Sequence, residues 1–183
     1  MTVKECIAAA AVELGIGDEV RDCLDGTSTV ANGDVENLLQ CFNLVENELA
    51  LDYLPLHAED TLETQTGTVR YAELSQPAVR ILGVRDEAGA EIAYRLFPEY
   101  LKAQAGKLTV RYTYTPKAKT LSGRSDYTLY ASVRLFAYGM AAEYAAASGQ
   151  YEAAAVWDKK YKAAITAAYR THKAKKIRAR RWV

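Results

Sequence analysis

The sequence changes its hydrophobic periodicity twice, and this pattern limits the folds that the chain can adopt. Apolar residues recur at helical spacing up to Pro55, alternate with polar residues between Thr61 and Thr115, and return to helical spacing after Ser122-Gly123. Alternation places every second side chain on one face of a strand, whereas a repeat near 3.6 places apolar side chains along one side of a helix. We therefore predict an α+β fold in which a small antiparallel β unit is inserted into a mainly helical bundle of about four helices.

Two helices are predicted before Pro55. The first spans Thr2–Leu14, where apolar residues follow steps of four, three and four, and a short helical turn follows between Asp18 and Leu24. The second begins at a side-chain cap on Asn32 or Asp34 and carries an apolar stripe until the proline stops it.

The middle of the chain predicts strands. The clearest is Leu108–Tyr114, in which apolar and aromatic residues alternate with Thr and Arg, as expected for a half-buried antiparallel strand. Val79–Val84 and Glu91–Leu96 read as two more strands, joined through the turn-forming residues Asp86–Gly89. Thr61–Tyr71 supplies one or two others.

Two further helices are predicted after the β unit. The first, which includes Val133–Tyr144, has few polar positions on any side, so we expect it to be buried nearly all round. Ser148-Gly149 ends it, and the next helix carries alanines and aromatics on one face with lysines off that face. The predicted organisation is a discontinuous helical core of residues 1–60 and 122–169, a β insertion of residues 61–121 and a basic tail of residues 170–183.

Charge is distributed unevenly along a chain whose formal net charge is zero. Lys159–Val183 holds ten of the 23 Lys and Arg residues and no Asp or Glu. The preceding residues therefore hold 13 basic and 23 acidic side chains, a net charge of about −10 by subtraction. The acidic residues match no calcium loop, so we interpret them as a solvated acidic surface.

The basic tail has three interpretations. It is a nucleic-acid arm, a solvated charge run, or a docking peptide. We favour docking, because an exposed tryptophan after two arginines is costly to leave in water and is a preferred interface anchor. The expected partner-binding residues are Lys175, Lys176, Ile177, Arg178, Arg180, Arg181, Trp182 and Val183.

The sequence gives no sign of catalytic or metal-binding chemistry. It lacks the motifs of nucleotide-binding loops, serine hydrolases and zinc peptidases, and its two histidines and three cysteines have no metal-ligand spacing. His57 is interpreted as a surface or structural residue, and Cys6 and Cys41 as buried thiols on apolar helix faces. No apolar run approaches the length of a membrane span. We expect a protein inside the cell that is not an enzyme and needs no cofactor.

Four segments together carry a family resemblance. They are Tyr53-Leu54-Pro55 after two amphipathic helices, Leu108–Pro116 at the end of the β insert, Ser148-Gly149-Gln150 between two Ala- and Tyr-rich helices, and the terminal Arg180–Val183. In this order the chain resembles the head-tail connector adaptors, or head-completion proteins, of tailed bacteriophages. The resemblance covers nearly the whole chain and is architectural. The β segment is longer than the short insert of the smallest adaptors.

The resemblance implies a structural virion protein at the head-tail interface. Such adaptors form a ring, typically of twelve copies, beneath the portal of the capsid; their C-terminal segments grip the portal, and the bore carries the genome. The implied partners are portal protein, stopper or tail proteins, further copies of the chain, and DNA that passes without specific binding. The host cytoplasm would hold the protein before assembly.

An acidic bore would let DNA slide, because like charge removes the counterion-release drive for binding. The candidates for lining it are Asp18, Glu19, Asp22, Asp25, Asp34, Glu36, Glu46 and Glu48. The alternatives are a cytosolic nucleic-acid-binding or scaffold protein that uses the same tail, and a stopper or tail-completion protein of the virion.

Overall fold

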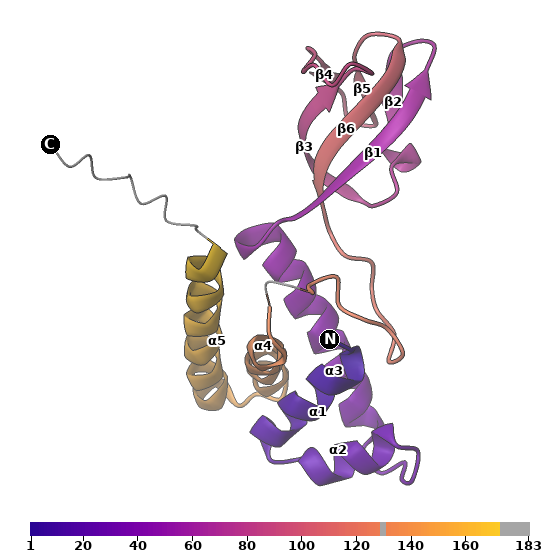
Figure 1. The fold of residues 1–183 in the computed structure, drawn as a ribbon. Helices are drawn as coiled ribbons and strands as arrows, with labels where there is room; N and C mark the ends of the chain where they lie inside the picture. The colour runs from indigo at the N-terminus through magenta and orange to yellow at the C-terminus, as the bar shows by residue number, and fades with distance from the viewer. Residues whose placement is uncertain (129–130, 173–183) are drawn as a thin grey trace, which may run out of the picture. The chain divides into compact units, whose positions relative to one another are not determined.

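The computed structural model describes residues 1–128 and 131–172, which form a mixed helix and sheet fold (Figure 1). The chain divides into two compact units. A helical unit contains Met1–Val45 and the described residues from Lys119 onward, and a β unit contains Glu46–Ala118. The predicted insertion began at residue 61, so the structure places the start of the β unit earlier along the chain.

The helical unit contains five helices. They are α1 (Val3–Leu14), α2 (Gly17–Leu24), α3 (Asn32–Glu48, whose last residues belong to the β unit), α4 (Val133–Ala147) and α5 (Tyr151–His172). Thr2 caps α1 through a reciprocal pair of hydrogen bonds with Glu5, and Gly15 ends α1 at a φ of 79°, a conformation that favours glycine. The sequence predicts that the tail begins at residue 170, whereas in the structure α5 continues to His172.

Helix α4 is the most buried element of the helical unit, as its sequence predicted. Nine of its fifteen residues are buried, and it packs against α1 and α5. Phe136 of α4 stacks on Phe42 of α3 with ring centroids 5.0 Å apart, and Tyr127 lies 6.2 Å from the same ring. Cys6 and Cys41 are buried at helix faces, as predicted.

A polar contact joins α3 to α4. The Tyr144 hydroxyl donates a hydrogen bond of 2.5 Å to Oδ1 of Asp34, in the first turn of α3. This hydrogen bond, followed by burial and the negative charge of Asp34, raises the pKa of Tyr144 to about 12. The tyrosine therefore stays neutral at any physiological pH and holds the C-terminal half of α4 on α3.

The β unit begins where α3 ends. A π-helical turn, η1 (Leu49–Tyr53), continues α3 and ends just before Pro55. The strands are β1 (Leu56–Thr64), β2 (Thr68–Arg70), β3 (Ala78–Arg85), β4 (Arg95–Leu96), β5 (Tyr100–Lys102) and β6 (Gly106–Tyr114), with a 3₁₀ turn η2 (Tyr71–Glu73) before β3.

The strands form two antiparallel sheets of three. One has the order β1-β6-β3 and the other β2-β5-β4. In the first, β1 pairs with β6 over their full lengths, from Leu56 opposite Tyr114 to Thr64 opposite Gly106. The alternation of β6 puts Leu108, Val110 and Tyr112 into the core of the unit.

The predicted strand Glu91–Leu96 is only partly correct. After the turn at Asp86, Glu91 forms a single bridge with Arg85, and the Ile92 amide donates to the Val84 carbonyl. The chain then passes to the other sheet, where only Arg95 and Leu96 are paired, with β5. The alternating pattern arose because Ile92 and Tyr94 both pack on the core while the chain crosses between sheets. Alternate burial does not require a continuous strand.

A polar network around Asp60 joins three parts of the β unit. The Tyr112 hydroxyl donates to Oδ2 of Asp60 at 2.6 Å, and Ser75 donates to both carboxylate oxygens of Asp60 at 2.7 and 2.9 Å. Burial raises the pKa of Asp60, but the hydrogen bonds from Tyr112 and Ser75 outweigh it and leave that pKa lowered. The network ties β1, the loop before β3 and β6 together.

Replacing Tyr112 by Phe should therefore destabilise the protein. The substitution removes a donor from a carboxylate and leaves Asp60 with fewer partners, which costs about 1–3 kcal/mol of unfolding free energy. Urea unfolding checks this, with Tyr94→Phe, a half-buried tyrosine on the same core, as control. Equal stability of the two variants would mean that the network contributes nothing beyond packing.

Tyr144→Phe should change how stability depends on alkaline pH. The pKa of Tyr144 rises from an ordinary 10.0 to about 12 on folding, so the unfolded chain loses this proton first. The free energy of unfolding should fall between about pH 10 and 12 in the native sequence, and the Phe variant should lack that part of the decline. Unfolding curves at several pH values test this, with Tyr151→Phe, a 75 % exposed tyrosine, as control. Parallel curves for all three proteins would contradict it.

Candidate docking groove

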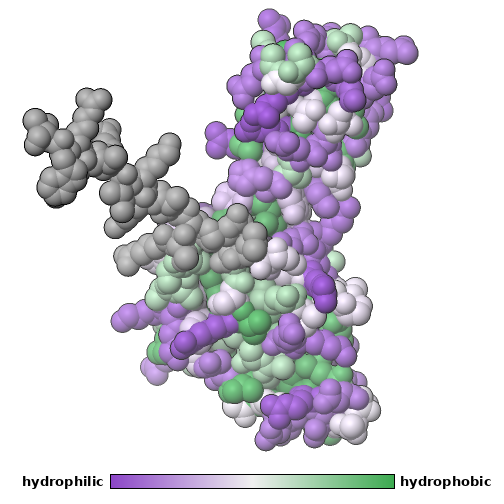
Figure 2. All heavy atoms as spheres, viewed as in Figure 1, coloured by the Kyte–Doolittle hydropathy of each residue, from purple (hydrophilic) through white to green (hydrophobic). Residues whose placement is uncertain are grey.

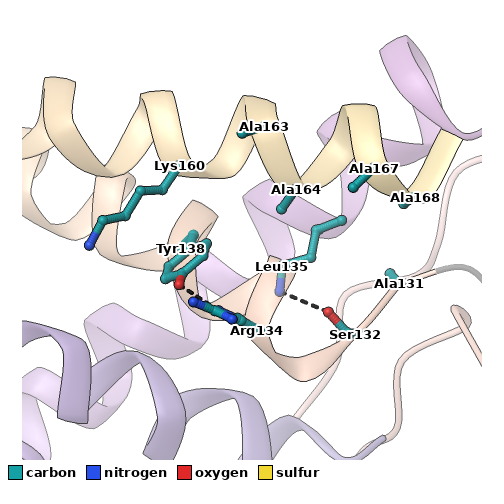
Figure 3. Close-up of a pocket in the computed structure, with 10 residues that line it drawn as sticks. All are labelled: Ala131, Ser132, Arg134, Leu135, Tyr138, Lys160, Ala163, Ala164, Ala167 and Ala168. Carbon is teal, nitrogen blue, oxygen red and sulfur yellow. Dashed lines mark hydrogen bonds between the residues drawn. The ribbon is translucent and has the colours of Figure 1, made fainter. Parts of the chain in front are cut away.

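The helical unit has a groove between α4 and α5. Its volume is about 700 Å³, and Figure 3 shows its lining. The α5 side is an alanine wall, made of Ala163, Ala164, Ala167 and Ala168. Because alanine carries only a methyl group, this wall leaves room beside the α5 backbone. Leu135 of α4 lies below it, and Ser132 caps α4 by accepting from the Leu135 amide at 3.2 Å.

The other part of the groove combines aromatic rings with positive charge. Tyr138 of α4 stacks on Trp157 of α5 with centroids 5.8 Å apart. Lys160 Nζ lies 3.8 Å from the Trp157 centroid and 5.5 Å from that of Tyr138, while Arg134 lies 5.2 Å from the Tyr138 centroid. Arg134 Nε also donates to the Tyr138 hydroxyl at 2.5 Å. These cation–π contacts position both cations at the groove.

The two groove cations are available to an acidic partner. Within residues 1–128 and 131–172, no ion pair of Arg134 or Lys160 is formed, whereas the neighbouring Lys162 pairs with Asp158 at 2.7 Å. Arg134 and Lys160 are both exposed. A groove with an alanine wall and two cations at one end suits an occupant that carries both apolar and acidic groups.

The β unit has a separate apolar depression. Its volume is about 200 Å³, and it is lined by Tyr71, Ala78, Val79, Arg80, Ile81 and Leu96. Val79 and Leu96 remain 52 % and 56 % exposed, and nearby Phe97 stacks on Tyr100 at 4.7 Å. Figure 2 shows apolar surface between hydrophilic side chains on each unit.

The described residues hold neither a metal site nor a membrane-spanning helix. Among the residues that the structure describes, no group of three His, Cys, Asp or Glu side chains lies close enough to hold a metal ion. No described helix is both long and apolar enough to cross a membrane. His57 lies exposed on β1.

The predicted tail contacts cannot be placed. Lys175, Lys176, Ile177, Arg178, Arg180, Arg181, Trp182 and Val183 all lie outside the described residues.

The predicted acidic residues are not equivalent in the structure. Asp18, Glu19, Asp22, Asp25 and Glu36 are exposed, and the first three lie together on α2. Asp34 is half-buried and bonded to Tyr144, and Glu48 is half-buried. Glu46 is only 1 % exposed, so it adds nothing to the acidic surface of the chain.

Sequence reasoning did not identify the groove. Two local signals were present, since Arg134 and Tyr138 stand four residues apart and Trp157 and Lys160 three apart, spacings that bring side chains together on one helix. That the two pairs meet depends on how α4 packs against α5, which spacing within a helix does not reveal.

Comparison with known proteins adds no further candidate. No protein-family model matches this chain, and no curated protein matches it significantly.

Proposed function

We propose that this protein is a structural adaptor of a tailed-bacteriophage virion, which assembles as a ring of twelve copies under the capsid portal and links head to tail. It has no catalytic role in this proposal and uses no cofactor. In this proposal the helices of the helical unit form a bundle, the β unit is an insertion into it, and the basic C-terminal segment is a docking tail. The architectural resemblance supports this identity.

The observation that carries the proposal is the presence of a docking surface on each unit. The helical unit has the cationic groove between α4 and α5, and the β unit has the depression at Val79 and Leu96. Concave apolar surfaces with a few placed charges favour protein partners. A connector must hold neighbouring copies and also proteins on either side of it, so it needs several independent surfaces. We assign stopper or tail proteins to the β unit and portal protein to the tail.

The acidic residues on and near α2 support the passage of DNA. Asp18, Glu19, Asp22 and Asp25 are exposed, with Arg21 as the one basic residue of α2. A bore lined by such a surface repels phosphate and removes the counterion-release drive for binding. In our proposal DNA therefore moves through the ring without specific contacts.

A second candidate function rests on the tail. Its lysines, arginines and Trp182 also suit a nucleic-acid-binding or scaffold protein, with phosphate contacts and stacking on a base. Salt dependence separates the two, because phosphate contacts weaken steeply as salt rises, whereas an anchored tryptophan keeps an apolar contribution. A stopper or tail-completion role in the same virion is a third assignment.

Binding to the portal protein encoded by the same virus tests the proposal. The full chain should bind assembled portal, and a chain truncated after Ala174 should keep its helical circular dichroism and lose binding. Trp182→Ala should weaken binding by about 2 kcal/mol, or roughly 30-fold in Kd, as expected of an interface anchor. Lys173→Ala, in the tail but outside the expected partner-binding residues, is the matched control and should have a much smaller effect.

Two results would overturn the adaptor proposal. One is undiminished portal binding by the truncated chain together with normal virion assembly, which would remove the tail's role. The other is no portal binding by the full chain but salt-dependent DNA affinity that the truncation abolishes, which would favour the nucleic-acid function.

A further inference from the structure

The corner between α1 and α2 is complementary to the groove. A notch of about 320 Å³ lies there, lined by Val12, Gly15, Ile16, Gly17, Asp18 and Glu19. The Val12 side chain is 58 % exposed. A methyl group on Gly17 would lie 3.0 Å from Val12 Cγ2, so glycine keeps the notch open beside the valine. The corner thus offers an apolar side chain framed by carboxylates.

The charges around the corner are nearly all negative. Glu13, Asp18 and Glu19 are exposed, and the Asp18 side chain is 98 % exposed although it lies 3.5 Å from Arg21. The groove has the opposite character, with Arg134 and Lys160 beside its alanine wall. The two surfaces are therefore opposite in charge, and each has an apolar part that the other can contact.

The two surfaces belong to different helix pairs of the helical unit. Helix α5 packs against α4, α4 against α1, and α1 against α2. In Figure 1, α5 lies at the left of this unit and α2 at its base. A single copy therefore carries the groove and the acidic corner on different helix pairs, and a head-to-tail contact between copies needs two such distinct surfaces.

We propose that the α4–α5 groove binds the α1–α2 corner of a second copy of this chain. Val12 of one copy lies against the alanine wall of the next, and Asp18 and Glu19 meet Arg134 and Lys160. This inference rests on the proposed ring and names the surfaces that join its neighbours. Because the two patches differ, the contact is heterologous and repeats from copy to copy, as a ring requires.

Two other occupants fit the groove less well. A second groove is disfavoured because it would bring Arg134 and Lys160 against the same cations. The chain's own segment 173–183 carries six Lys and Arg residues and no Asp or Glu, so it matches the groove in sign instead of complementing it. The acidic corner has the opposite charge and an exposed apolar side chain beside it.

Chemical cross-linking of the full chain tests the contact. In a Cys23→Ser background, Val12→Cys and Ala167→Cys place thiols at the corner and the groove, while Cys6 and Cys41 remain buried. A short bismaleimide should join the two single variants to each other when they are mixed at high concentration, and neither to itself. The chain that carries both cysteines should give a ladder of dimers, trimers and higher species. Gln40→Cys on the exposed side of α3 is the matched control in place of the groove cysteine.

Charge reversal supplies the specificity test. Lys160→Glu or Glu19→Lys in the double-cysteine chain should each reduce the ladder at least tenfold, and the two together should restore much of it, because the pair is then complementary again. Glu36→Lys makes the same charge change away from the corner and should leave the ladder intact. Circular dichroism verifies that each variant is folded.

Three outcomes would overturn the inference. The first is cross-linking no stronger than that of the Gln40→Cys control. The second is the formation of dimers by the Ala167→Cys chain alone. The third is a ladder of unchanged intensity in both charge-reversal variants. Loss of the ladder on adding a short oligonucleotide, with oligonucleotide binding abolished by Lys160→Glu, would assign the groove to phosphate instead. Portal binding is measured separately. If the chain binds portal but forms no ladder, only the proposed contact is wrong. If it forms a ladder but does not bind portal, the adaptor function is wrong.

Discussion

The close packing of α4 against its neighbours is the constraint on which the helical unit depends. At Gly139 a methyl group would lie 3.0 Å from Val45 of α3 and from the Tyr161 ring of α5. Glycine thus lets α4 approach both helices at once, at a distance that any larger side chain would increase. With nine residues buried, α4 leaves few side chains for other roles. Near the start of the helix, the exposed Arg134 and the mostly buried Tyr138 form one side of the groove.

This packing links structure to the proposed function. Since α4 fixes α5, it also fixes the distance between the alanine wall and the Tyr138–Trp157 pair. Small side chains on α5 keep the groove open, while the aromatic pair holds Lys160 and Arg134 in place. A groove built in this way is formed before a partner arrives, so binding needs little further ordering of the chain.

Much of the fold followed from local patterns. Helix α1 matched its prediction because capping and apolar spacing agree at Thr2 and Gly15, and β6 matched because its alternation is long and regular. The prediction of a strand at Glu91–Leu96 was only partly correct, because alternate packing on a core produces the same sequence pattern as pairing in a sheet. The groove was beyond prediction, since it exists only through the contact of α4 with α5. Glu46 is a second example. A glutamate is expected to be exposed, and only the packing of the helices around it shows that this one is buried.

A cryo-electron microscopy structure of this chain with the portal protein of the phage to which we assign it tests the proposed ring most directly. We predict a closed ring of copies in which the α1–α2 corner of each copy occupies the α4–α5 groove of the next. In this ring Val12 lies against the alanine wall and Glu19 beside Lys160. A ring whose copies meet through other surfaces, with the groove open to solvent, would contradict the proposed contact. Absence of any ring on the portal would contradict the function itself.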